Sequence, residues 1–262
     1  MKKSRLFLLI FLCFLFSNNV LSQIEGTITE IKTNKTIPFS EIFTKYKLDK
    51  EVPTLVITWS GTWCYPCIRL INRYNNCDPS MLNLITINVD SEDDLKDVLR
   101  EGHHLKWDNA INFHANLNEE KSGFNRIFNT TSAPLILIMK NGAISDALIN
   151  YSIFPYVLLQ AGRFKDIKFI WNSSEDLNSI AWNYYKTETD RAKLEEAKRW
   201  VIRSIDLNEN YHNTDTYAAL LFKTENYTEA LKMAKRAIEL AKKDEIDYDS
   251  TTELINQIIE KL

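Results

Sequence analysis

Two cysteines separated by two residues, Cys64 and Cys67, are the side chains of this sequence best suited to chemistry. The apolar run at 53–58 predicts a buried strand before them, and residues 68–74 carry apolar side chains at helical spacing. Cys64 is therefore expected at a helix N-terminus, where free backbone N–H groups and the macrodipole favour a thiolate. Cys67 follows one turn later, where it can close a disulfide with Cys64 or attack a mixed disulfide formed on it. Pro66 suits a first helical turn because its missing N–H costs nothing there.

A Cys-x-x-Cys pair can also form half of a zinc site, which requires two further ligands. The remaining ligand types are Cys77 and four scattered histidines. Three of these histidines fall within residues 102–116, which we interpret as a solvated loop: His103, His104 and His114. We therefore expect redox chemistry at the pair, with no metal and no other cofactor.

The sequence around the pair resembles the thioredoxin superfamily, whose mark is Trp-Cys-x-x-Cys after a central strand. Residues 59–67 read Trp-Ser-Gly-Thr-Trp-Cys-Tyr-Pro-Cys, which is especially similar to the TlpA-like branch. The superfamily also has a cis-proline that faces the disulfide and precedes a strand. Pro134 holds that place, and Asn141-Gly142 then gives a hairpin signal after the strand. The resemblance implies an α/β thioredoxin-like fold, with a central mixed sheet flanked by helices.

The resemblance also implies a mechanism of thiol–disulfide exchange with protein substrates. Cys64 as a thiolate attacks a substrate disulfide, and Cys67 resolves the mixed disulfide. Trp63 would shield the pair. Pro134 would keep the backbone of Ala133 free to pair with an extended substrate segment. The TlpA-like branch favours a reductant that is recharged by a membrane electron donor, although the same chemistry can run as an oxidant.

Two positions depart from the family pattern. Thr58 stands where many thioredoxins have a buried acid, and Leu70 stands where TlpA-like reductases often have a glutamate. The group that deprotonates Cys67 is therefore not evident from the sequence. Cys77 lies further along the chain and lacks the helix-start position that activates a thiolate, so we interpret it as a bystander.

The first 22 residues have the pattern of a secretory signal peptide: a basic start, an apolar stretch at 6–16 and a small-residue site before Gln23. The apolar stretch is shorter than the roughly 20 residues that span a bilayer, which favours cleavage over anchoring. We therefore expect a periplasmic protein cleaved between Ser22 and Gln23. The chain is 45% hydrophobic and 26% charged with a net charge of −3, so no attraction to nucleic acid or to an acidic membrane is indicated.

The predicted domains are a signal peptide at 1–22, a thioredoxin-like domain at 23–170 and a helical region at 171–262. The first domain should contain several further elements: strands at 26–31 and 83–90, a short helix at 39–43, helices starting at Glu92 and spanning 119–128 and 155–164, and a hairpin of strands at 135–139 and 144–149.

The helical region resembles tetratricopeptide repeats. The small residues that let two repeat helices approach are matched by Ala230 and Ala237, and Ala197 and Ser204 lie 33 positions earlier. The expected helices are 177–187, one containing Ala197, 215–224, 226–240 and a cap at 250–262. Two repeats and a cap fall below the three units that a repeat array usually needs, so we expect this all-α region to pack on the redox domain.

Two other functions compete with the oxidoreductase. In the alternative, the chain is an interaction protein whose TPR-like region binds a partner, while the thioredoxin fold presents or protects a cysteine. A peroxidase-like thiol enzyme is disfavoured, because such sites do not use a Cys-x-x-Cys after this Trp-rich strand. Turnover of a generic disulfide separates the oxidoreductase from the interaction protein.

Overall fold

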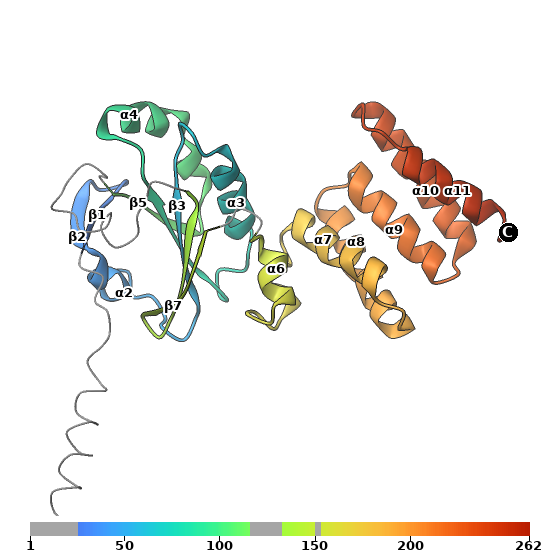
Figure 1. The fold of residues 1–262 in the computed structure, drawn as a ribbon, viewed down its shortest axis with the longest axis horizontal. Helices are drawn as coiled ribbons and strands as arrows, with labels where there is room; N and C mark the ends of the chain where they lie inside the picture. Colours follow the sequence, from blue (N-terminus) through green and yellow to red (C-terminus); the bar gives the residue numbers. More distant parts are fainter. Residues whose placement is uncertain (1–25, 116–132, 150–152) are drawn as a thin grey trace, which may run out of the picture. The chain divides into compact units, whose positions relative to one another are not determined.

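The computed structural model describes residues 26–115, 133–149 and 153–262. These residues divide into two compact units (Figure 1). The first contains residues up to Ile68 together with Asn83–Asn150, and the second contains Arg69–Leu82 together with Tyr151–Leu262. Each unit is described by itself.

A seven-stranded mixed sheet in the order β2-β1-β5-β4-β3-β6-β7 forms the centre of the first unit. Its strands are β1 Thr27–Glu30, β2 Lys35–Pro38, β3 Thr54–Trp59, β4 Asn83–Asn88, β5 Ala110–His114, β6 Leu135–Lys140 and β7 Ala143–Ile149. Strand β3 lies parallel to β4 and antiparallel to β6. Every residue of β3 is buried, as its continuous apolar and β-branched sequence predicts.

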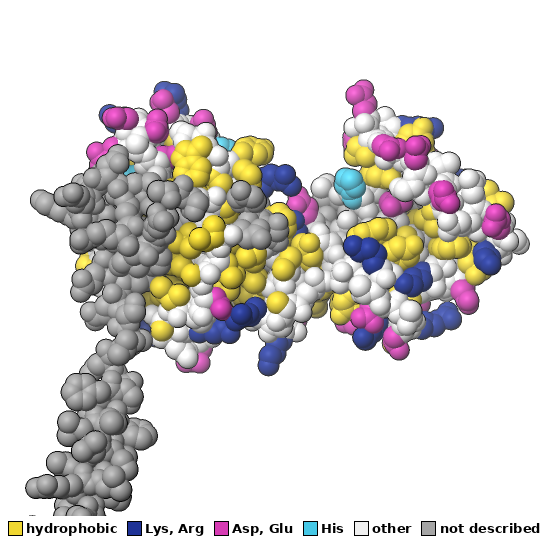
Figure 2. All heavy atoms as spheres, viewed as in Figure 1, with side chains coloured by type: hydrophobic (Ala, Val, Ile, Leu, Met, Phe, Trp, Pro, Cys, Tyr) yellow, Lys and Arg dark blue, Asp and Glu magenta, His cyan; other side chains and the backbone are white. Residues whose placement is uncertain are grey.

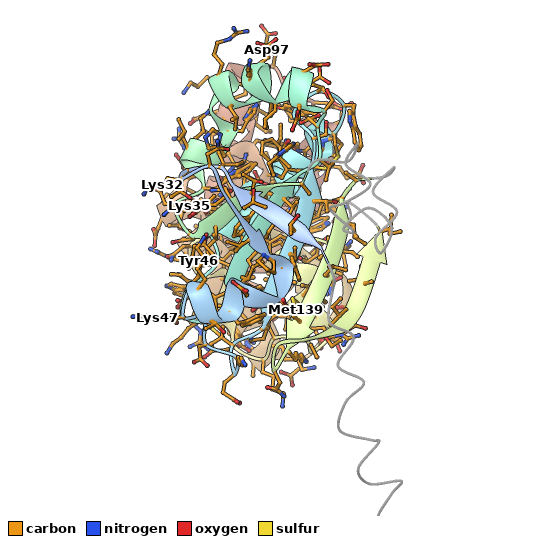
Figure 3. The ribbon with its side chains drawn as sticks, turned by 90° about the vertical axis from the view of Figure 1, so that its left-hand side faces the viewer. Lys32, Lys35, Tyr46, Lys47, Asp97 and Met139 are labelled. Atoms are coloured by element: carbon orange, nitrogen blue, oxygen red, sulfur yellow. A yellow bond between two sulfur atoms is a disulfide. The ribbon has the colours of Figure 1, made fainter. Side chains whose placement is uncertain are left out.

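The core of the first unit is made by side chains from several strands and from the short helical segments η1 (Phe39–Glu41) and α2 (Ile42–Lys45). Met139 of β6 belongs to this core, and Tyr46 packs against it. In Figure 3, Lys32 and Lys35 of the β1–β2 hairpin lie on the outside of this unit, where their charges stay hydrated.

Helix α3 (Tyr65–Asn75) follows β3, and helix α4 (Glu92–Glu101) follows β4. The predicted start of α4 is confirmed, because Ser91 is its N-cap and accepts a hydrogen bond from the Asp94 N–H. The hairpin between β6 and β7 turns at Asn141 and Gly142, which both have positive φ. This is the conformation for which an Asn-Gly pair is favoured.

The sequence interpretation was wrong about residues 102–116, which do not form a loop throughout. A 3-10 turn, η2 (His103–Lys106), is followed by β5, which pairs in parallel with β4 and antiparallel with β1. Apolar Ile111 and Phe113 alternate with polar Asn112 and His114, a strand pattern that the short, histidine-containing segment left unrecognised. Strand β2 was likewise not predicted. The helix expected at 119–128 and the signal peptide at 1–22 lie outside the described residues.

The second unit is helical over residues 153–262 and also contains most of α3. Its other elements are α6 Pro155–Gln160, η3 Ile167–Ile170, α7 Ser174–Thr187, α8 Arg191–Leu207, α9 Tyr211–Lys223, α10 Tyr227–Lys243 and α11 Asp249–Ile259. Helix α7 packs on α8, and α9 packs on both α8 and α10 (Figure 1). On the face of this unit shown in Figure 2, basic and acidic side chains are interspersed.

The small residues that suggested repeats lie at helix contacts. Ala197 and Ser204 of α8 and Ala230 and Ala237 of α10 are all fully buried. Small side chains at these places let neighbouring helices approach closely, as the 33-residue spacing suggested. Whether the hairpins are tetratricopeptide repeats stays a prediction.

The chain therefore has an α/β thioredoxin-like fold followed by an all-α region of helical hairpins. The predicted domain boundary after residue 170 stays a prediction. Within the part of the chain that the structure describes, we find no helix with the length and apolar character to cross a membrane.

Candidate active site

Cys64 and Cys67 form a disulfide at the start of α3, with Cα atoms 5.3 Å apart. The Cys67 N–H donates to the Cys64 carbonyl, which is the first hydrogen bond of the helical turn. Cys64 is 3% exposed and Cys67 is fully buried, whereas the flanking Trp63 and Tyr65 are 52% and 70% exposed. The residues on either side of Cys64 in the sequence thus present exposed aromatic rings that a polypeptide substrate can contact.

The peptide bond between Ala133 and Pro134 is cis, as the resemblance implies. Sγ of Cys64 lies 3.5 Å from the carbonyl oxygen of Ala133. In the disulfide this sulfur has no hydrogen, so the contact becomes a possible S–H···O bond only after reduction. The structure thereby brings Cys64 and the residue before Pro134 together, although they are far apart in the sequence.

The loop that leads from β3 to Cys64 is held by one buried carboxylate, that of Asp90. The Ser60 hydroxyl donates to Oδ1 at 2.5 Å, and the Thr62 hydroxyl donates to Oδ1 at 2.7 Å. The Gly61 N–H and the Asn88 amide both donate to Oδ2 at 2.7 Å. Asp90 therefore fixes the three residues that precede Trp63 and Cys64.

The protonation state of Asp90 follows from these contacts. Burial raises the pKa of the Asp90 carboxyl, but the hydrogen bonds from Ser60, Thr62, Asn88 and Gly61 together outweigh it and hold the pKa below its usual value. Asp90 is thus ionised near neutral pH and is a poor proton acceptor for Cys67. Its role in the site is to anchor the loop.

The sequence pattern around Cys64 does not point to Asp90. A better signal was available, since Asp90 directly follows β4 and Cys64 follows β3, which is parallel to β4. Residues after neighbouring parallel strands meet at the same edge of a sheet. The position of Asp90 at the loop could have been inferred from that rule.

The two positions that depart from the family pattern are both buried in apolar surroundings. Thr58 is 1% exposed, and its hydroxyl oxygen accepts a hydrogen bond from the Leu135 N–H at 2.8 Å. Leu70 is fully buried. No carboxylate stands at either place, so proton transfer from Cys67 does not use the family's acids.

Cys77 is buried and free, and it belongs to the second unit. Burial, with the nearby Asp176 charge adding to it, raises the pKa of the Cys77 thiol well above its usual value. A protonated buried thiol is unreactive, which supports the interpretation of Cys77 as a bystander.

The three histidines of residues 102–116 do not gather. His114 lies in β5 and its Nε2 is 3.1 Å from the Asp90 carbonyl, while His103 pairs with Glu101. Burial lowers the pKa of His104, so it is neutral at pH 7. Among the residues that the structure describes, no group of three or more His, Cys, Asp or Glu side chains is placed to hold a metal ion.

Comparisons with known proteins give structural neighbours but no close relative. No family model and no curated protein matches the chain. A secreted disulfide oxidoreductase from Mycobacterium tuberculosis, described as homologous to E. coli DsbE, matches at 12% identity and a TM-score of 0.38, covering 54% of this chain and 96% of its own.

Two further solved structures show the same kind of likeness. StoA from Bacillus subtilis matches at 16% identity and a TM-score of 0.31, covering 47% of this chain and 85% of its own. A thiol:disulfide interchange protein from Bacteroides sp. matches at 15% identity and a TM-score of 0.35, covering 54% of this chain and 88% of its own.

Proposed function

We propose that this protein is an exported thiol–disulfide oxidoreductase that exchanges disulfides with protein substrates and acts as a reductant. The observation that carries the proposal is the Cys64–Cys67 disulfide at the start of α3, with the outer sulfur beside the carbonyl that precedes a cis-proline. Cys64 has the helix-start position that favours a thiolate, and Cys67 is buried behind it.

The reaction starts from the reduced protein. The Cys64 thiolate attacks one sulfur of a substrate disulfide, so that the substrate S–S bond breaks and one substrate thiolate leaves. The Cys67 thiolate then attacks Sγ of Cys64, which breaks the mixed disulfide and releases the second substrate thiolate. The substrate gains two electrons and, at neutral pH, two protons. The Cys64–Cys67 disulfide that remains must be reduced by a dithiol donor before the next turnover, and we assign that role to a membrane electron donor.

Substrate docking would use main-chain pairing beside the disulfide. Pro134 has no N–H, and the Ala133 carbonyl points toward the Cys64 sulfur at 3.5 Å. The exposed rings of Trp63 and Tyr65 offer apolar contact on either side. Neither kind of contact reads a particular side-chain sequence, so this site suits many polypeptide substrates.

Export is part of the proposal and rests on the signal-peptide pattern at 1–22. In an exported chain, so few cysteines leave the disulfide for chemistry rather than for scaffolding. Intact-mass analysis of protein recovered from the periplasm should find Gln23 as the first residue. A recovered species that retains Met1 to Ser22 would contradict the soluble periplasmic form.

The central test is reduction of insulin by the full mature chain with dithiothreitol as donor, together with the reduction potential measured against glutathione. We expect turnover well above the uncatalysed rate and a potential more negative than the cytosolic glutathione poise of about −220 to −260 mV. A folded protein with no turnover on insulin or on small disulfides would refute the enzyme and favour the partner-binding alternative. A clearly more positive potential would instead indicate an oxidant.

A further inference from the structure

The main-chain segment that follows Ala133 is anchored to β3 by a side chain. Strand β6 begins at Leu135 and pairs antiparallel with β3, and the ladder reaches its last pair at Ile57 and Ile136. Extending the register by one position sets Thr58 opposite Leu135. There the Leu135 N–H donates to the Thr58 hydroxyl at 2.8 Å.

This hydrogen bond has a specific place in the docking segment. Pro134 offers no N–H, so the Leu135 N–H is the first main-chain donor after Ala133. The Thr58 hydroxyl therefore fixes the segment within two residues of the carbonyl that lies beside Sγ of Cys64. Thr58 is 1% exposed and Leu135 is 4% exposed, so water does not replace the bond if it is lost.

We infer that Thr58 is a positioning residue for polypeptide substrates, because it sets the place of the Ala133 backbone relative to Cys64. This inference rests on the proposed function. Many thioredoxins carry a buried acid at this position. In this chain the residue there holds the main chain in place instead. A hydroxyl also suits the task at every pH, because it does not titrate, and the anchor stays unchanged while the thiols ionise.

The test uses two variants of the full mature chain. Thr58→Val keeps the shape of the side chain and removes the acceptor, whereas Thr58→Ser keeps the acceptor and removes a methyl group. Insulin is the polypeptide substrate, and bis(2-hydroxyethyl) disulfide is a substrate too small to pair with the Ala133 backbone. Hydrogen exchange of the Leu135 amide, followed by NMR in the reduced protein, reports the anchor without turnover.

The expected result separates the two substrates and the two variants. Thr58→Val should raise KM for insulin about fivefold, as expected for the loss of one hydrogen bond. The same variant should lose less kcat/KM on the small disulfide. The ratio of kcat/KM for insulin to kcat/KM for the small disulfide should therefore fall severalfold. Thr58→Ser should keep both that ratio and slow exchange at Leu135, while Thr58→Val exchanges faster there.

Three outcomes would overturn the inference. The first is a Thr58→Val ratio equal to that of the wild type, which would show that the anchor does not affect docking. The second is an equal loss by both variants on both substrates, which would indicate damage to the fold alone. The third is slow Leu135 exchange in Thr58→Val, which would show that the hydroxyl does not hold this segment. A wild type that turns over neither disulfide refutes the proposed function instead, and slow Leu135 exchange in that protein would identify the anchor as structural only.

Discussion

Cys64 and Cys67 occupy different places on the same helical turn, and this difference predicts different trapping behaviour. Cys67→Ala leaves the attacking thiolate but no resolving thiol, so it should accumulate mixed disulfides with substrates. Cys64→Ala should not, because Cys67 is fully buried. Non-reducing electrophoresis followed by mass spectrometry measures the mixed disulfides that each variant accumulates. Equal trapping by the two variants would refute the assignment.

The buried thiol of Cys77 supplies the matched control for this experiment. Its pKa is raised by burial, so Cys77→Ala should keep disulfide reductase activity within about twofold of wild type. The same variant should trap no more substrate than the wild type. A larger loss of activity would give Cys77 a role that its burial argues against.

Asp90 should contribute strongly to stability through the loop that precedes Cys64. Asp90→Ala leaves the buried Ser60 hydroxyl and the buried Asn88 amide without their carboxylate acceptor, and each unpaired buried donor costs about 1–3 kcal/mol. We expect the free energy of unfolding of the oxidised protein to fall by at least ~2 kcal/mol. Urea unfolding measures the change, and a change below 0.5 kcal/mol, the scale of a surface substitution, would contradict the anchoring role.

The stability from Asp90 should also depend on pH. Its pKa is lower in the folded protein than the roughly 3.9 of an unfolded aspartate. The contribution is therefore complete above about pH 5 and is lost as pH falls toward the folded pKa. In thermal melts, the gap in Tm between wild type and Asp90→Asn should be constant from pH 7 to 5 and shrink below pH 4. A gap that widens at low pH would show the opposite sign of the pKa shift.

The local sequence pattern was enough to predict the role of some site residues and not of others. Cys64, Cys67 and Pro134 were found because their meaning lies in a few neighbouring residues. Thr58 was recognised only as a missing acid, because its bond to Leu135 joins two strands that are distant in the sequence. A hydrogen bond of that kind depends on strand register, and the sequence specifies register only through the whole sheet.

Among the elements, α4 packs so closely on the active-site loop that only glycine fits at position 61. A Cβ added to Gly61 would lie 2.6 Å from Cγ1 of Val98, which is itself buried in α4. Gly61→Ala should therefore destabilise the protein by about 1–3 kcal/mol, as overpacking usually does. Chemical denaturation of the single variant measures the cost.

Val98→Ala provides the matched rescue. Removing the two methyl groups makes room for the new Cβ, so the double variant should be more stable than the sum of the two single changes predicts. A double-mutant cycle should give a favourable coupling of about 1 kcal/mol or more. Additive effects would contradict a steric conflict between the added Cβ and Val98.

Strand β5 was interpreted as a loop although its residues alternate between apolar and polar. The segment is short, and its histidines suggested a solvated loop. Both polar side chains of β5 find buried partners: Asn112 accepts from the Thr86 hydroxyl at 2.6 Å, and His114 contacts the Asp90 carbonyl. The alternation in β5 indicates a strand, but these partners, which come from other strands and loops, could not be read from the sequence.

For the whole molecule, helix α3 holds the disulfide in its first turn and takes part in the helical unit with its residues from Arg69 onward. The Arg73 guanidinium donates to both carboxylate oxygens of Asp176, at 3.0 and 2.5 Å, and stacks on Phe154 at 3.9 Å. Asp176 is fully buried in α7 and also accepts from the Ser173 hydroxyl. The periodic helices of residues 171–262 were predictable, but this bond to α3 was not.

A deletion and a point variant test the expectation that the helical region stabilises the redox fold. Deleting residues 172–262 removes Asp176, so Arg73 loses two hydrogen bonds to a carboxylate, and hydrogen bonds to charged groups contribute about 1.5–3 kcal/mol each. The truncated chain should therefore melt at least ~5 °C below the full protein in calorimetry. In the full chain, Asp176→Asn removes the ion pair and keeps the rest of the helical packing. It should therefore lower Tm by less than the deletion does. A truncated chain that keeps both its melting temperature and its activity on small disulfides would show instead that the helical region is an independent partner module.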